Sequence, residues 1–345
     1  MLGGGVFVTQ NKTLPGSYIN FVNVASATSA FGERGIVAIA LPLNKSAGTV
    51  IEVTKTDFMT NSAEVLGAEY AADEVAPLRE IFRNANKVYV YDLGESGTVD
   101  DAIKAFEPYE FNVLCAYTDV AEDITKYVAV IKSWRDTIGK KCQVVVYNTS
   151  KSDYEGVINV VSTVSNEGAD AFALTAWVAG AEAGCAINES CTNKLYNGEY
   201  TIVTDKTQTE LENCIKAGEI AFHLVYGEVR MLEDINSLVT TTDDKGEDFK
   251  YNQTIRVIDQ IANDIAKLFN TKYLGKIPNN ASGRISLWGD IVKHHKELER
   301  LQAIENFDAT ALTVVQGETK KSVVVNDVVT VVNAMAQLYM TVVVQ

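Results

Sequence analysis

In the first half of the chain, short apolar segments alternate with amphipathic ones, and this pattern constrains the fold most. Continuous apolar runs at 87–93, 111–117 and 142–147 are typical of strands that are buried on both faces. Two amphipathic segments separate them, one beginning at Thr98 and one spanning 121–138. Strands that alternate with helices in this way predict a parallel sheet covered by helices on both sides.

The segments on either side of this unit predict additional domains. Short β-like runs precede it at 35–41 and 49–53, and a polar, acidic loop follows it near 240–248. Beyond that loop come two amphipathic helices and two strands, so the fold class is a multidomain combination of α/β and α+β units. We expect an N-terminal arm (1–20), a small β-rich domain (21–85), an α/β domain (86–240), an α+β C-terminal domain (241–334) and a C-terminal arm (335–345).

The C-terminal stretch contains two valine-rich runs, 323–332 and 342–344, joined by a polar and flexible spacer. An unpaired apolar strand edge recruits other strands, so this stretch needs something to cover it. We interpret the first run as a strand of its own domain and the second as a strand that is added to another copy of the protein. The glycine-led N-terminus, with one short apolar run at 6–8, is a second segment that could reach a neighbour.

Composition limits the possible partners. A net charge of −15 and a pI near 4.7 argue against nucleic acid and against an anionic membrane surface. No uninterrupted apolar stretch reaches the roughly 20 residues that span a bilayer. Without a secretion signal, we expect folding in a cytoplasm. In that compartment the five cysteines should be buried thiols rather than disulfides: Cys115, Cys142, Cys185, Cys191 and Cys214.

We find no catalytic constellation in the sequence. It contains no phosphate-binding loop, no dinucleotide fingerprint, no nucleophile elbow and no HExxH zinc motif. His223 lies within an alternating strand pattern, where a structural role is the favoured interpretation. His294 and His295 are adjacent, so their side chains should point in different directions and not share one metal ion. We therefore expect no catalytic residue, no metal and no cofactor.

Several segments, in the same order along the chain, resemble the tail sheath proteins of contractile phages and of phage-derived tail-like bacteriocins of the Gram-positive type. Any one segment would be weak, but the series is fairly specific and covers most of the chain. The similar segments are 11–12, 15–18, 174–180, 183–184, 254–265, 273–276, 279–280, 283–284 and 334–344.

This resemblance implies a structural role. Sheath subunits stack as hexameric rings around an inner tube, and the sheath contracts to drive the tube through a target envelope. The implied partners are other copies of the chain, the tail tube protein, and the baseplate and tail terminator proteins. The particle would be a phage virion or a phage tail-like particle that is assembled in the host bacterial cytoplasm. The α/β domain would be subtilisin-like without a catalytic triad.

The resemblance also assigns roles to residues, because family members extend both arms into sheets of neighbouring subunits. The expected N-terminal arm residues are Val6, Phe7, Val8 and Tyr18, and those of the C-terminal arm are Leu338, Tyr339, Val342, Val343 and Val344. The receiving sheet would contain Val323, Val325, Val329 and Val331.

A helix over 289–307 carries Lys293, Lys296 and Arg300 on its polar side, and this basic stripe could contact an acidic tube surface. An equally open interpretation is that these three side chains only face solvent and bind no partner. For the whole chain, the alternatives to a sheath are an α/β hydrolase-like enzyme with an unrecognised site, and a different ring or shell protein.

Overall fold

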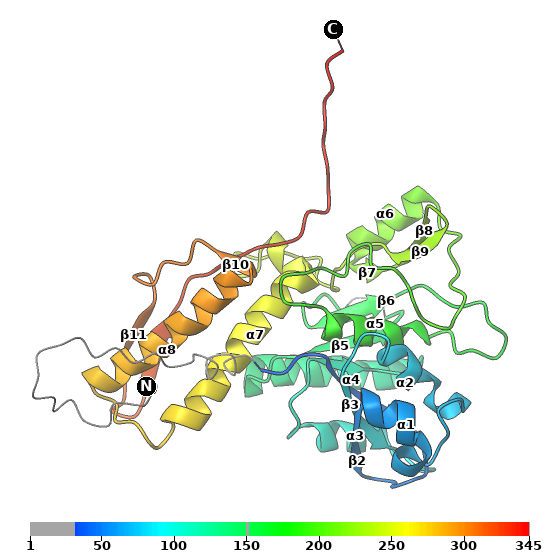
Figure 1. The fold of residues 1–345 in the computed structure, drawn as a ribbon, viewed down its shortest axis with the longest axis horizontal. Coiled ribbons are helices and arrows are strands. Elements are labelled where there is room, and N and C mark those ends of the chain that lie inside the picture. Colours follow the sequence, from blue (N-terminus) through cyan, green and yellow to red (C-terminus); the bar gives the residue numbers. More distant parts are fainter. Residues whose placement is uncertain (1–31, 150–151, 345) are drawn as a thin grey trace, which may run out of the picture.

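The centre of the molecule is a seven-stranded sheet, seen in a computed structural model that describes residues 32–149 and 152–344 (Figure 1). The strand order is β2-β3-β1-β4-β5-β6-β7, and all neighbouring pairs are parallel except β2 with β3. The strands are β1 (Ile36–Leu41), β2 (Val50–Thr54), β3 (Lys87–Asp92), β4 (Val113–Cys115), β5 (Gln143–Tyr147), β6 (Val157–Val160) and β7 (Glu219–Ile220). The predicted mixed α/β architecture is therefore confirmed.

Helices cover both faces of this sheet. Side chains of β1 alternate between the faces: Val37 and Ile39 pack in one apolar cluster, which includes Trp177, and Ala38 packs in a second one, which includes Trp134. The first cluster contains residues of α1, α2 and α5, and the second contains residues of α3 and α4. These helices are α1 (Lys55–Leu66), α2 (Ala76–Ile81), α3 (Val99–Phe106), α4 (Ala121–Ser133), which continues as a π-helical turn (Trp134–Ile138), and α5 (Leu174–Gly184).

The segment that we expected in a separate β-rich domain is part of this sheet. β1 lies between β3 and β4, so the expected boundary after residue 85 does not separate two sheets. The expectation of a β-rich domain over 21–85 also missed α1. The missed signal is local: the Thr54 side chain caps the helix by accepting a hydrogen bond from the amide of Asp57, and Gly67 ends it with a φ of 76°.

A smaller peripheral group of elements follows β6 in the chain. Helix α6 begins with a capping box between Thr207 and Glu210, and the β8–β9 hairpin turns at Tyr226 and Gly227. The bounds are α6 (Gln208–Ala217), β8 (Phe222–Val225) and β9 (Glu228–Met231). Among the residues that the structure describes, no helix combines the length and apolar composition needed to cross a bilayer.

The C-terminal unit is built on two long helices that pack through Ile265 and Leu268 of one and Leu287 and Ile291 of the other (Figure 1). Its elements are α7 (Asn252–Leu268), a π-helical turn (Phe269–Tyr273), α8 (Ala281–Arg300), β10 (Ile304–Glu305), β11 (Thr313–Gln316), β12 (Val323–Asn326) and β13 (Thr330–Val331). The helix that we placed at 289–307 therefore begins earlier and ends at Arg300. It stops there because Gln302 adopts a left-handed φ of 62°, after which β10 begins.

We expected one strand over the valine-rich run at 323–332, but the structure contains two strands there. β12 pairs antiparallel with β11, whereas β13 pairs antiparallel with β10 in a separate two-stranded sheet. Asp327 lies at the break and binds Nε2 of His295 at 2.7 Å. The break directs the end of the chain away from the β11–β12 hairpin and toward the first turn of α7.

Candidate assembly surface

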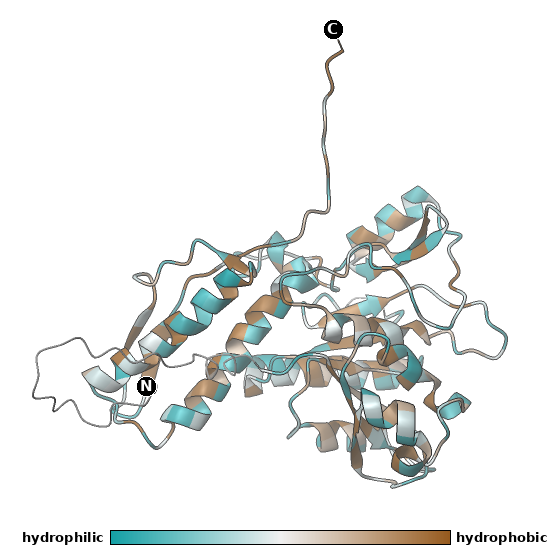
Figure 2. Cartoon of the chain, viewed as in Figure 1, coloured by the Kyte–Doolittle hydropathy of each residue, from teal (hydrophilic) through white to brown (hydrophobic). Residues whose placement is uncertain are grey.

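Residues 335–344, the described part of the expected C-terminal arm, are extended and contain no helix or strand (Figure 1). The arm projects away from the body (Figure 1), and much of its length is coloured as hydrophobic (Figure 2). Leu338 and Tyr339 are each 87% exposed and Val344 is 90% exposed. Because burying such side chains is favourable by about 1.5–3 kcal/mol each, this exposure makes the arm a candidate interaction segment.

Buried side chains of α7 fix the point where the arm begins. The Gln253 side chain donates to the carbonyl of Val332 at 3.2 Å and accepts from the amide of Ala334 at 2.9 Å. Asn333 and Thr254 bind each other through their side chains at 3.1 and 3.2 Å. The arm is therefore free beyond Ala334 but firmly held before it.

The same helix also binds the chain near its first described residues. The carboxylate of Asp264 accepts a hydrogen bond from the amide of Gly32 at 2.6 Å, and Gln260 accepts one from Arg34 at 3.3 Å. Gln253 and Asp264 are eleven residues apart, which is about 16 Å along an α-helix. One helix therefore anchors the chain both at its first described residues and just before the C-terminal arm.

Buried polar contacts join α7 to the α/β body. Asp259 receives two hydrogen bonds from the guanidinium of Arg135, at 2.5 and 2.8 Å. Arg256 donates to Glu182 at 2.7 Å and to Asp234 at 3.3 Å. Burial and the neighbouring Asp234 raise the pKa of Glu182 well above its usual range. The buried charges of Arg135 and Arg256 are tolerated because Asp259 and Asp234 pair with them, and the pairing fixes the orientation of α7.

The two small sheets differ in how much of their valine surface is covered. In the β11–β12 hairpin, Val324 and Val325 of β12 are 44% and 37% exposed. In the β10–β13 sheet, Val331 packs against a cluster that includes Val257 and Leu298. Each sheet has only two strands within the described part of the chain, so each has unpaired edges. The hairpin is therefore the more open of the two.

The structure places the other sequence-derived residues as follows. The N-terminal arm residues Val6, Phe7, Val8 and Tyr18 lie outside the described residues. Within the expected receiving sheet, Val323 packs partly against the apolar cluster between α7 and α8, and Val329 lies in the link before β13. In the C-terminal arm, Val342 and Val343 are exposed like their neighbours.

The basic stripe on α8 divides into two parts. Lys293 and Lys296 are exposed, whereas Arg300 forms an ion pair with Glu297 at 2.5 Å, one turn earlier on the same helix. Arg300 therefore satisfies its charge locally, and the two lysines are the residues of this stripe that remain available for an acidic partner.

The histidines and cysteines occupy structural positions. The five cysteines are buried and free, as predicted. His294 and His295 direct their Nε2 atoms to different carboxylates, Asp264 and Asp327, as we expected for adjacent residues. Their Nδ1 atoms, however, lie only 3.3 Å apart, so the rings are closer than expected.

One buried group has the composition of a metal site. Ligand atoms of Glu182, Cys191 and Asp234 lie within 4.8 Å of one another. Arg256 already binds both carboxylates and supplies positive charge there, so we assign this group a structural role.

Comparison with known proteins identifies the family. The models for the phage tail sheath protein central domain and for the phage tail sheath C-terminal domain match residues 95–237 and 244–345. The tail sheath protein of Clostridium phage phiCD119 is 28% identical over 298 residues, which cover 84% of this chain and 81% of that protein.

Solved structures agree with this result. The sheath tail protein of Desulfitobacterium hafniense has a TM-score of 0.79 and 26% identity, over 94% of this chain and 99% of that one. The anti-feeding prophage helical sheath in its contracted state has a TM-score of 0.68 and 16% identity, over 96% and 99% of the two chains. At that identity the second likeness shows the fold alone.

These relatives define a class of structural sheath proteins of contractile injection systems, and they are not enzymes. The chain belongs to the phage tail sheath protein family. The hydrolase-like alternative is therefore set aside.

Proposed function

We propose that this chain is the subunit of a contractile tail sheath. Copies stack as hexameric rings around an inner tube, and contraction of the sheath drives the tube through a target cell envelope. The tail tube protein, the baseplate and the tail terminator are its partners in a phage virion or phage tail-like particle, which is assembled in the host bacterial cytoplasm. The α/β body is subtilisin-like and serves as a scaffold without a catalytic triad.

The C-terminal arm is the observation that carries this proposal. An extended apolar segment that is exposed beyond Ala334 gains stability only when it finds a partner. Adding it as a strand to a neighbouring sheet would form backbone hydrogen bonds at about 0.5–1.5 kcal/mol each, and would bury its valines. The clamp at Gln253 keeps the other end of the arm attached to its own body. Such a joint can stay closed while subunits rotate.

The β11–β12 hairpin is the receiving sheet in this proposal. Its valines at 323 and 325 lie on a strand with an unpaired edge, and Val325 remains 37% exposed. Val329 and Val331 pack into their own domain at the root of the arm, so they support the joint from the donor side. The N-terminal arm of another copy would add to the same sheet.

Lys293 and Lys296 contact the tail tube in this proposal. They are exposed on one helix of a chain whose net charge is −15, so they offer local positive charge against an acidic tube surface. Arg300 contributes less because Glu297 already neutralises it.

Electron microscopy of the purified chain tests the proposal. We expect striated tubes or polysheath from the full chain, and a monomer that does not polymerise after deletion of residues 335–345. A matched control replaces Tyr226 by Ser, because this side chain is equally exposed at the distant β8–β9 turn. That variant should polymerise normally. Normal polymers from the arm deletion would contradict the arm assignment, and closed shells from the full chain would contradict the sheath.

A further inference from the structure

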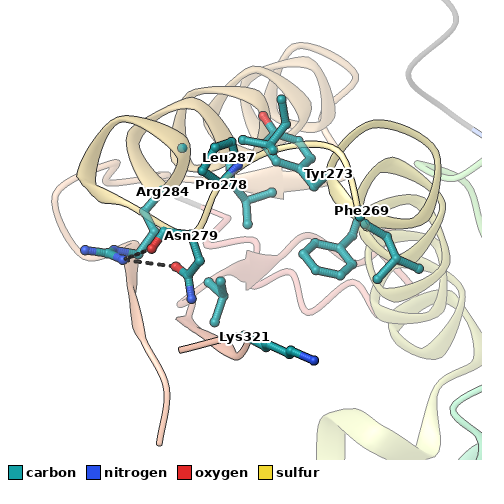
Figure 3. Close-up of a pocket in the computed structure, with 12 residues that line it drawn as sticks. Phe269, Tyr273, Pro278, Asn279, Arg284, Leu287 and Lys321 are labelled. Atoms are coloured by element: carbon teal, nitrogen blue, oxygen red, sulfur yellow. Dashed lines mark hydrogen bonds between the residues drawn. The ribbon is translucent and has the colours of Figure 1, made fainter. Parts of the chain in front are cut away.

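An apolar pocket of about 90 Å³ opens beside the start of β12 (Figure 3). The pocket lies between the π-helical turn that follows α7, the loop after it and the first turns of α8. The aromatic rings of Phe269 and Tyr273 form part of one wall and are nearly parallel, at an interplanar angle of 8°. The other apolar lining residues include Ile277, Leu287 and Val323.

Two cations line the same pocket. Arg284 and Lys321 make no salt bridge with any residue that the structure describes. Arg284 is oriented by Asn279, whose backbone and side-chain oxygens accept its hydrogen bonds at 3.2 and 3.0 Å. Asn279 also donates to the carbonyl of Ser322 at 2.8 Å. The pocket is therefore tied to the strand that receives a neighbour's arm in the proposed function.

The arm of the same chain does not fill this pocket. It leaves the body beside β10 and projects away from α7 and α8 (Figure 1). Tyr339 is the single aromatic residue between 334 and 344, and it is 87% exposed. Its hydroxyl donates to Gln337 within the arm. The ring is therefore presented without a partner on the body of its own subunit.

We propose that the pocket receives Tyr339 from the C-terminal arm of a second copy of this chain. The inference rests on the proposed strand addition and names its anchor. An aromatic ring fits here because the walls are apolar and aromatic, while unpaired cations at the pocket favour a π-face. A single aromatic anchor in a pocket commonly supplies much of the energy of an interface. Tyr339 thereby fixes the register of the added strand.

Sedimentation of assembled sheath gives the first test. Replacing Tyr339 by Ala should raise the protein concentration needed for polymerisation about tenfold or more, whereas replacement by Phe should leave it nearly unchanged, because Phe keeps the ring. Met335→Ala is the matched control, since Met335 is an equally exposed apolar residue at the base of the arm. Normal assembly of the Tyr339→Ala variant would overturn the inference. If the separate Lys321→Glu variant then assembled poorly, a segment other than Tyr339 would be the one that fills the pocket.

Disulfide trapping gives the second test. The variant Ile277→Cys, Tyr339→Cys is assembled above the raised threshold concentration that loss of the Tyr339 ring should cause, and is oxidised with diamide; we expect a ladder of covalent multimers on a denaturing gel. The control is Leu224→Cys, Tyr339→Cys at the same concentration, because Leu224 is exposed on the distant β8–β9 hairpin. The five native cysteines are buried, so background should be low. Polymers without a ladder, or an equal ladder from the control, would refute the pocket while leaving the sheath proposal intact. Failure of the unmodified chain to polymerise would instead contradict the proposed function.

Discussion

The side chain of Gln253 holds the backbone of Ala334 by a 2.9 Å hydrogen bond, and so defines where the C-terminal arm leaves the body. Gln253 is 3% exposed, and its amide also reaches the carbonyl of Val332. A joint between subunits transmits force only if the donated strand is anchored at its base. If the arm joins subunits as proposed, Gln253 is the residue that attaches it to α7.

Replacing Gln253 by Ala should loosen this joint. Two backbone groups lose their partner, so we expect unfolding to become easier by about 1–3 kcal/mol. The amide hydrogen of Ala334 should exchange faster with solvent, as measured by hydrogen exchange. Gln208→Ala serves as the control, because Gln208 is exposed at the start of α6. Unchanged exchange at Ala334 would show that the clamp does not hold the arm.

Two glycines in helices should respond to alanine in opposite ways. A Cβ at Gly180 would lie 2.4 Å from the carbonyl oxygen of Ile81, because α5 packs closely on α2. Gly180→Ala should therefore destabilise the protein by about 1–3 kcal/mol. A Cβ at Gly289 would meet nothing within 4 Å, so Gly289→Ala should stabilise it by about 0.5–1 kcal/mol. Urea denaturation measures both, and the same sign for the two variants would contradict the packing described.

Asp92 should make stability depend on pH in the acid range. Burial alone would raise its pKa, but the backbone amides of Asn44, Lys45, Ser46 and Gly94 bind the carboxylate and lower the pKa below its usual value. The folded state therefore binds this proton less readily than the unfolded chain. Its stabilising contribution is present above about pH 4 and is lost as the pH falls through the lowered pKa.

The Asp92→Asn variant isolates this effect. It should be less stable than the unmodified chain at pH 6, and the gap should close as the pH falls below about 4. Urea midpoints at a series of pH values measure the difference. If the difference in stability between the two proteins stayed constant down to pH 2, the negative charge of Asp92 would not be what the amides stabilise.

Charge reversal on α8 tests the tube contact. The double variant Lys293→Glu, Lys296→Glu should fold normally, because both side chains are exposed, but it should fail to assemble on tubes. The control reverses Lys104 and Lys216, exposed lysines on α3 and α6. Co-sedimentation with purified tubes reports the result. Unaltered assembly of the double variant would leave the stripe as a solvated helix face.

Local signals in the sequence were sufficient for much of the α/β body. The helix expected to begin at Thr98 does begin there, and its capping box is a local signal because Thr98 and Asp101 lie three residues apart. The alternation of apolar strands and amphipathic helices between 87 and 147 likewise predicted buried strands covered by helices. The apolar composition of residues 334–344 indicated an interaction segment without any knowledge of the fold.

Sequence reasoning failed where distant parts of the chain meet. The separate β-rich domain was wrong because β1 inserts between β3 and β4, which follow it in sequence. The valine run at 323–332 was read as one strand, yet its two halves pair with β11 and β10. Backbone pairing between remote segments leaves no periodic trace in either one, so pattern alone could not assign these partners.

The sequence by itself determined the class of the body, the apolar arm and the family resemblance, because these depend on residue order and local hydrogen bonding. Only the tertiary structure decided how the arm is held and where a partner could dock. Asp259 meets Arg135 across 124 residues, and Gly32 meets Asp264 across 232. Such contacts form only when the chain buries its core and brings those groups together, which is why α7 emerges as a common anchor for Gly32 and for the start of the C-terminal arm.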